Sequence, residues 1–194
     1  MKINLLKKEN QIISVWAGGT TTQLAIYPES ASYHLRDFIF RISSAKVEAE
    51  TSVFTKLPGV SRILMVLEGE LQLEHKGRYT TNLKKFDSDS FEGSWDTTSQ
   101  GKVNDFNLMT REGAKGTLQS KILQSGESFS ETLFVNSSFV GFYLLCGSIQ
   151  LSHLSKTYSL HKNDFILLSK DGGSEEIKIT AAEYCEMLVP LITI

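Results

Sequence analysis

Three apolar segments of the sequence carry polar side chains at alternate positions. Successive side chains of a β-strand point to opposite faces, so alternate residues share one face. The polar residues that share a face in this way are Arg41 and Ser43 in FIFRISSA, Arg62 in RILMVL, and Asp105, Asn107 and Arg111 in VNDFNLMTR. If the three polar faces coincide, they predict a β-barrel with a polar lumen.

The arginines of this set determine which ligands the lumen could bind. Antiparallel sheets permit a face that looks at bulk water, but these polar residues are mixed with Ile, Leu, Val and Met, which favours an inward face. A buried arginine needs a partner, so Asp105 is expected to pair with either Arg41 or Arg62. The arginine left over could hold a carboxylate or a phosphate of a ligand in a bidentate fork.

The segment WAGGTTTQLAIYP, residues 16–28, adds neutral hydrogen-bonding groups. Its two glycines allow close approach of the backbone, and Thr20, Thr21 and Gln23 supply hydroxyl and amide groups. A phosphate-binding P-loop is excluded, because the Lys-Ser/Thr ending is missing. A plain β-turn is the alternative for this segment.

The sequence predicts neither a metal nor another cofactor. A transition-metal site needs three or four converging ligands, and the histidines are single and scattered, at His34, His75, His153 and His161. His75 and His153 are expected to face solvent at strand ends. No strand-turn-helix elbow frames a serine nucleophile, and nothing in the sequence brings Asp105 together with Glu68 or Glu70 as an acid-base pair.

The elements that must position these residues are short strands. Gly, Ser, Asn and Asp recur about every ten residues between alternating apolar runs, which indicates an all-β sandwich or barrel. No segment shows a sustained helical stripe. The strands expected from this pattern span residues 11–16, 20–27, 38–47, 62–67, 70–76, 103–111, 117–123, 128–135, 139–146, 148–154, 156–160, 164–170, 175–180 and 183–194.

An internal repeat divides these strands into two sets. The run at 64–91 aligns with the run at 142–167, with Gly69 opposite Gly147 and Leu73 opposite Leu151. The repeat predicts two similar barrels, an N-terminal one at 1–112 that holds the pocket and a structural C-terminal one at 113–194, with strands free to cross between them. The second copy has no arginine equivalent to Arg62, so the pocket is expected in the first.

The composition excludes some partners. A length of 194 residues with 41% hydrophobic and 22% charged residues is typical of a globular protein. The net charge of -2 gives no reason to expect nucleic acid or a membrane as partner. Cys146 and Cys185 lie in apolar runs and are expected to be free and buried. The N-terminus does not resemble a signal peptide, so a cytoplasmic location is expected.

The order and spacing of WAGGTTTQLAIYP, FRISSA, SVFTKLPGVSRILMVLEGELQL and DFNLMTR resemble the HutD/Ves family of bacterial proteins. The resemblance covers residues 11–190 and implies a bicupin, two cupin barrels in one chain, that is cytoplasmic and associated with histidine utilisation. It also implies a metal-free pocket, since Ser61 and Arg62 stand near the place where metal cupins carry a His-x-His pair. The ligand-binding residues that it implies are Trp16, Thr20, Gln23, Arg41, Ser43, Arg62, Asp105, Asn107 and Arg111. Many members carry a carboxylate at Gln23 and a Trp at Phe40, so ligand preference can differ here.

Three functions follow as hypotheses. The leading one is a regulatory protein that binds a small anionic metabolite such as formylglutamate. The second is a metal-independent isomerase or hydrolase in which Asp105 is the base and an arginine holds an oxyanion. The third is a structural or protein-binding module whose polar faces are solvated. The sequence favours a non-enzymatic role and leaves open a homodimer.

Overall fold

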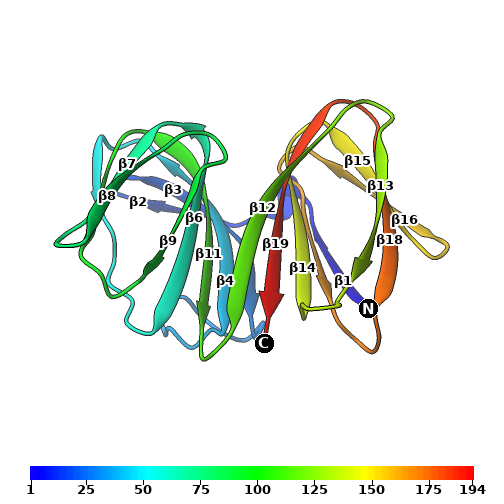
Figure 1. Ribbon diagram of the computed structural model, residues 1–194, viewed down its shortest axis with the longest axis horizontal. Helices are drawn as coiled ribbons and strands as arrows, with labels where there is room; N and C mark the ends of the chain where they lie inside the picture. Colours follow the sequence, from blue (N-terminus) through cyan, green and yellow to red (C-terminus); the bar gives the residue numbers. More distant parts are fainter. The chain divides into compact units, whose positions relative to one another are not determined.

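The computed structural model describes residues 1–194, and the predicted all-β fold is confirmed. It contains nineteen strands and one 3-10 turn, η1 (Lys8–Asn10). Nothing helical in the structure has the length and apolar character that crossing a bilayer would require. The chain forms two compact units, which we name barrel N (residues 12–116) and barrel C (residues 1–11 and 117–194). Figure 1 shows that each unit is built from β-sheets.

Barrel N is built from two antiparallel sheets. The larger has the order β2-β3-β4-β11-β6-β9 and the smaller the order β5-β10-β7-β8. The strands of the larger sheet are β2 (Ile13–Trp16), β3 (Gly19–Tyr27), β4 (Phe40–Val47), β11 (Val103–Arg111), β6 (Val60–Gly69) and β9 (Ser88–Glu92). The strands of the smaller sheet are β5 (Thr51–Val53), β10 (Thr97–Gln100), β7 (Leu71–His75) and β8 (Tyr79–Leu83).

Barrel C is also built from two antiparallel sheets, with the orders β1-β17-β14-β19-β12 and β13-β18-β15-β16. The strands of the first sheet are β1 (Lys2–Leu6), β17 (Phe165–Ser169), β14 (Phe139–Cys146), β19 (Cys185–Thr193) and β12 (Lys115–Leu123). The strands of the second are β13 (Ser128–Leu133), β18 (Glu175–Ala181), β15 (Ser148–His153) and β16 (Lys156–His161).

The strand orders confirm the predicted repeat. The run β9-β6-β11-β4 of barrel N corresponds to β17-β14-β19-β12 of barrel C, and β5-β10-β7-β8 corresponds to β13-β18-β15-β16. The turn between the repeated strands is also shared. Gly69 is the last residue of β6 and Gly147 directly follows β14, and their φ angles of 88° and 77° lie in the left-handed region that favours glycine. The same topology therefore occurs twice in the chain.

The first eleven residues correct the predicted division at residue 112. They were grouped with the N-terminal barrel, but β1 pairs with β17 of barrel C, with Leu5 opposite Ile166. The Lys7 Nζ atom forms an ion pair with Asp164 Oδ2 at 2.8 Å in the same unit. Strand β1 has no counterpart in the repeat, and its alternation does not indicate which sheet edge it joins. Its assignment to barrel C therefore follows only from its pairing with β17, which lies far away in the sequence.

The interiors of the two barrels differ. Barrel C holds a large contiguous apolar cluster that includes Phe134, Phe142 and Leu144. In barrel N one apolar cluster surrounds Leu64, Leu73 and Phe91 of β6, β7 and β9. A second, smaller cluster surrounds Phe38 and Met109. The space that an apolar core fills in barrel C is thus only partly filled in barrel N.

Candidate functional site

The candidate site is a cavity of about 660 Å³ inside barrel N. Its walls come from β3, β4, β6 and β11 of the larger sheet, from β2 and β5, and from the loop at residues 28–39. A volume of about 300 to 1,000 Å³ is typical of pockets for small molecules. Barrel N therefore has room for a ligand in its interior.

The predicted coincidence of the polar faces is confirmed. Strand alternation turns Arg41 and Ser43 into the cavity from β4, Arg62 from β6, and Asp105 and Asn107 from β11. All five are less than 8% exposed. The alternative in which these side chains face bulk water is therefore wrong.

Arg41 is held by neutral partners. Its Nε donates a hydrogen bond to Gln23 Oε1 at 3.0 Å, and its Nη1 donates to Ser43 Oγ at 3.1 Å. The guanidinium lies 4.4 Å from the centre of the Tyr33 ring, in cation-π geometry. Burial lowers the pKa of Arg41, and the electrostatic influence of Tyr33 opposes that shift. No carboxylate neutralises this arginine directly.

Arg62 is held in an aromatic frame. Its guanidinium carbon lies 4.7 Å from the Phe54 ring centre and 5.2 Å from that of Phe91. Its Nη2 donates to Asn107 Oδ1 at 2.8 Å, whereas its Nε is buried without any hydrogen-bond partner. Burial lowers the pKa of Arg62 to about 10, so the side chain is still charged at neutral pH. A buried charged group with an unused donor is suited to binding an anion.

Asp105 departs from the predicted arrangement, because it does not pair directly with an arginine. Its Oδ1 accepts a hydrogen bond from Asn107 Nδ2 at 2.6 Å, and Asn107 in turn accepts from Arg62. Burial raises the pKa of Asp105 to about 7, while the charge of Arg62 and the bond from Asn107 act in the opposite direction. The amide of Asn107 thus lies between the Asp105 carboxyl and the Arg62 guanidinium, and Arg62 has no direct carboxylate partner.

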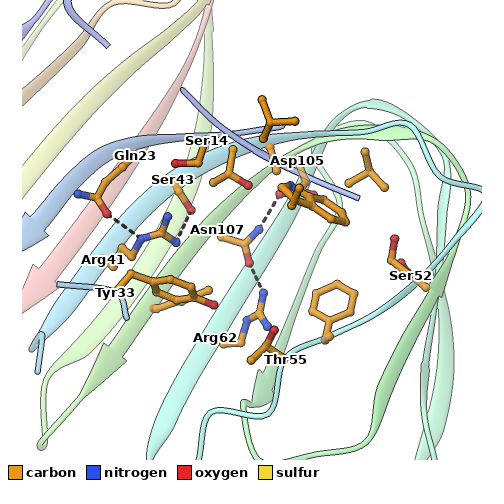
Figure 2. Close-up of a pocket in the computed structure, with 18 of the residues that line it drawn as sticks. Ser14, Gln23, Tyr33, Arg41, Ser43, Ser52, Thr55, Arg62, Asp105 and Asn107 are labelled. Carbon is orange, nitrogen blue, oxygen red and sulfur yellow. Dashed lines mark hydrogen bonds between the residues drawn. The ribbon is translucent and has the colours of Figure 1, made fainter. Parts of the chain in front are cut away.

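Figure 2 shows the two arginines on the same cavity, with Tyr33 beside both guanidinium groups. Ser14 and Thr55 also face this space. The polar groups are mostly hydrogen-bond donors or hydroxyls, and Asp105 is the only acidic side chain that lines the cavity. The arrangement can bind a negatively charged group at the arginines and hydrogen-bond it from hydroxyl groups around them.

The structure brings most of the predicted site residues together. Those that line the cavity are Trp16, Gln23, Arg41, Ser43, Arg62, Asp105 and Asn107. The Trp16 ring lies against Gly18, at a place where any side chain on residue 18 would overlap it. These residues remain candidates for ligand contact.

Thr20 and Arg111 do not line the cavity. The cavity side of β3 carries Thr21 and Gln23, so Thr20 lies on the other face. Arg111 has the same parity as Asn107, but it is the last residue of β11 and its Nε lies 3.6 Å from Glu112 Oε1. Counting in twos back from Gln23 would have selected Thr21 instead of Thr20.

Sequence reasoning missed the aromatic residues that contact the arginines, Tyr33, Phe54 and Phe91. Tyr33 belongs to the loop between β3 and β4, where no alternation predicts which side chains point inward. Phe54 follows β5, a strand of three residues that the pattern did not reveal. Arginine inside a barrel favours a nearby aromatic face, but that preference does not indicate which aromatic residue supplies it.

The cavity does not assemble a metal-ligand set. His34 and Asp105 are the only residues lining it that are His, Cys, Asp or Glu. No group of three or more such side chains anywhere in the structure is placed to hold a metal ion. Ser61, which the resemblance placed near the ligand positions of metal cupins, is exposed and donates to Glu92 Oε1 at 2.9 Å.

A second polar network lies elsewhere in barrel N and corrects the prediction for His75. This histidine was expected to face solvent, but it is 1% exposed because β7 turns Leu71, Leu73 and His75 inward. Its Nδ1 lies 2.8 Å from Thr97 Oγ1, and its Nε2 lies 2.8 Å from Asp89 Oδ2. Burial of Thr97 and of the histidine indicates a structural role for this network.

Several solved proteins are similar to this chain over nearly its whole length. A solved protein of unknown function from Pseudomonas aeruginosa PAO1, PA5104, is 19% identical with a TM-score of 0.86, and each chain covers 100% of the other. HutD from Pseudomonas fluorescens SBW25 is 19% identical with a TM-score of 0.74, over 99% of this chain and 98% of that one. The pirin YhhW of Escherichia coli, solved with nickel(II), is 12% identical with a TM-score of 0.72, and coverage is 100% of both chains.

These likenesses agree with the duplicated strand order and confirm the predicted bicupin fold. No curated protein matches the sequence. The family model HutD matches residues 8–189, which is nearly the whole chain. The protein therefore belongs to the HutD family.

Proposed function

We propose that barrel N binds a small carboxylated metabolite and that the protein acts by binding it, in a regulatory role, not by catalysis. The observation that carries this proposal is the pair of buried arginines, Arg41 and Arg62, which face one cavity without a direct carboxylate partner. Two charged guanidinium groups in a water-poor site are stabilised by an anion. Carboxylates suit the planar fork of arginine.

Membership of the HutD family directs the proposal to histidine degradation in the cytoplasm, where formylglutamate, glutamate and urocanate are the carboxylates to test. The related HutD of P. fluorescens was solved in a formate condition, and formate is itself a carboxylate. Both facts support a carboxylated ligand.

Thermal unfolding with each of these compounds tests the proposal. A ligand present at 100 times its dissociation constant adds about 2.7 kcal/mol of apparent stability. We expect a rise in melting temperature with at least one compound, and its loss in Arg41→Gln and in Arg62→Gln. Arg36→Gln is the matched control, because Arg36 is exposed and does not line the cavity. If millimolar concentrations of all three compounds leave the wild-type melting temperature unchanged, the assignment of the site to these carboxylates is refuted.

A catalytic role is the second candidate, and Asp105 is the residue that favours it. A buried carboxyl whose pKa is raised to about 7, beside an arginine and facing a cavity, has the properties of a general acid or base. In this role Arg62 would stabilise an oxyanion. Turnover of a bound carboxylate that is lost in Asp105→Asn, with binding retained, would replace the binding proposal with an enzymatic one.

A further inference from the structure

Asp105 is the only acidic side chain in a cavity that holds two buried arginines. Its cross-strand neighbours on β4 and β6 are Ala45 and Val66, so it lies between two apolar residues of the sheet. Asp105 is also 4% exposed, which leaves little water to solvate a negative charge. The ionised form of Asp105 therefore depends on positive charge nearby.

Arg62 supplies that positive charge through one intervening residue. Figure 2 shows the hydrogen bonds that connect Arg62 to Asn107 and Asn107 to Asp105. These bonds are 2.8 Å and 2.6 Å long, so a single amide group separates the guanidinium from the carboxyl group. The charge of Arg62 favours the ionised form of Asp105, whereas burial opposes it. Because the two influences are opposed, the protonation of Asp105 is sensitive to any further charge beside Arg62.

An anion bound at Arg62 changes this balance. Arg62 Nε has no hydrogen-bond partner, so Arg62 can bind a carboxylate while it keeps its bond to Asn107. The carboxylate offsets the positive charge that favours ionised Asp105, and it adds a negative charge to the same water-poor cavity. Both effects favour the protonated form of Asp105. A protonated carboxyl group keeps an acceptor oxygen, so the bond from Asn107 can persist.

Few other groups of the cavity carry charge or can titrate. They are Arg41 of β4, Arg62 of β6, and Tyr33 and His34 of the loop at residues 28–39. The parts of β2, β3, β5, β7 and β10 that line the cavity add none. A histidine can gain a proton near neutral pH, and His34 is exposed where Asp105 is buried. His34 is therefore the alternative proton acceptor that an experiment must separate from Asp105.

We infer that Asp105 takes up a proton from solvent when a carboxylate binds at Arg62, so that the affinity of the site falls as the pH rises. This inference rests on the proposed binding of a carboxylate and adds a regulation of that site by pH. One proton leaves the solvent for each Asp105 carboxylate that becomes a carboxylic acid, and no covalent bond of the ligand changes. Asp105 is then the counter-charge of Arg62 when no ligand is bound, and the ligand replaces it in that role.

Calorimetric titration in buffers of different ionisation enthalpy tests the inference, because it counts the protons taken up on binding. Formylglutamate and glutamate are the probes, since their carboxylates stay ionised above pH 6, whereas the imidazole of urocanate titrates in the range of interest. Burial raises the pKa of Asp105 to about 7, and a bound anion raises that pKa further. We expect uptake of roughly half a proton or more per ligand at pH 7.5 and little uptake at pH 6. Binding should be about fivefold to tenfold weaker at pH 8 than at pH 6.

Two variants assign the proton to a residue. Asp105→Asn has nearly the same shape but cannot take up a proton, so we expect binding without uptake and an affinity that does not change between pH 6 and pH 8. His34→Gln is the matched control, because it removes the alternative proton acceptor of the cavity. We expect it to keep the uptake of the wild type. The buffer series on the wild type needs no variant, so it tests the inference even if a variant folds poorly.

Three results would overturn the inference and leave the proposed function intact. They are binding of a probe to the wild type without proton uptake at pH 7.5, uptake that persists in Asp105→Asn, and uptake that disappears in His34→Gln. If neither probe binds, the inference is refuted as well, and the melting temperature with urocanate then decides the proposed function.

Discussion

Replacing Asp105 with Asn is predicted to stabilise barrel N, and to do so more strongly as the pH rises. Asp105 is 4% exposed, and its carboxyl group accepts a hydrogen bond from Asn107. An asparagine at 105 has nearly the same shape, and its amide oxygen can accept the same bond. It cannot ionise, however, so it avoids the cost of a buried negative charge.

The magnitude follows from the pKa of Asp105, which burial raises from 3.8 to about 7. Because the pKa is higher in the folded state, the folded protein holds this proton more tightly than the unfolded chain does. The stability linked to this proton is fully present below pH 3.8 and is lost as the pH rises from 3.8 to about 7. A pKa that is about three units higher in the folded state corresponds to about 4 kcal/mol in the free energy of unfolding.

Urea unfolding followed by tryptophan fluorescence measures this effect, because both tryptophans of the chain, Trp16 and Trp95, lie in barrel N. We expect Asp105→Asn to exceed the wild type in free energy of unfolding by about 2 kcal/mol at pH 5 and by about 4 kcal/mol at pH 8. Asp171→Asn, an exposed change in barrel C, is the control. A difference that stays constant or shrinks between pH 5 and pH 8 would refute the assignment of a raised pKa to Asp105.

Three further substitutions test the binding site, the His75 network and the core of barrel C one at a time. Asn107→Asp places a carboxylate 2.8 Å or so from Arg62, and we expect carboxylate affinity in calorimetry to fall at least tenfold; unchanged affinity would mean that Arg62 does not bind the ligand. His75→Leu removes the partner of the buried Thr97 hydroxyl and one partner of Asp89, which keeps its hydrogen bonds from Tyr79, and should cost about 1 to 3 kcal/mol in urea unfolding, whereas a neutral effect would show that this network is dispensable. Phe142→Ala opens a cavity in the core of barrel C and should cost about 3 to 5 kcal/mol without changing carboxylate affinity; a parallel loss of affinity would show that the two barrels are coupled.

The polar face of the cavity could be predicted from the sequence because a strand has a strict period of two. Once Arg41, Arg62 and Asp105 are assigned to strands, the face that each occupies is fixed relative to its neighbours. The remaining question was whether the faces meet. The faces do meet, because β4, β11 and β6 are antiparallel neighbours in one sheet. Paired residues of adjacent strands point to the same side of a sheet.

The sequence did not predict the side-chain contacts that depend on packing between segments far apart in the chain. Asp105 was expected to pair with an arginine, yet Asn107 lies between them, and which polar neighbour intervenes depends on side-chain conformation. His75 lies on the inner face of β7, but a polar residue at a strand end gives no signal of burial. Tyr33 reaches Arg41 from a loop, and its position is set by the loop conformation and not by a periodic pattern.

The boundary of the barrels was missed for a related reason. Residues 64–91 and 142–167 share a pattern, so the repeat could be found by aligning the chain with itself. Strand β1 lies outside that pattern and joins β17, more than 150 residues away. Local alternation identifies a strand. The strand with which it pairs depends on which sheet has an edge strand without a neighbour, and alternation does not show this.

The unequal interiors of the duplicated barrels have a consequence for how the molecule unfolds. Barrel C is held by a continuous apolar cluster, while barrel N contains a large cavity lined by buried charges. Units that differ this much in packing open with different free energies, so native-state hydrogen exchange should be faster in residues 12–116 than in the core strands β14 and β19. A ligand that fills the cavity would slow exchange in residues 12–116, so protease resistance of this segment would report occupancy of the site.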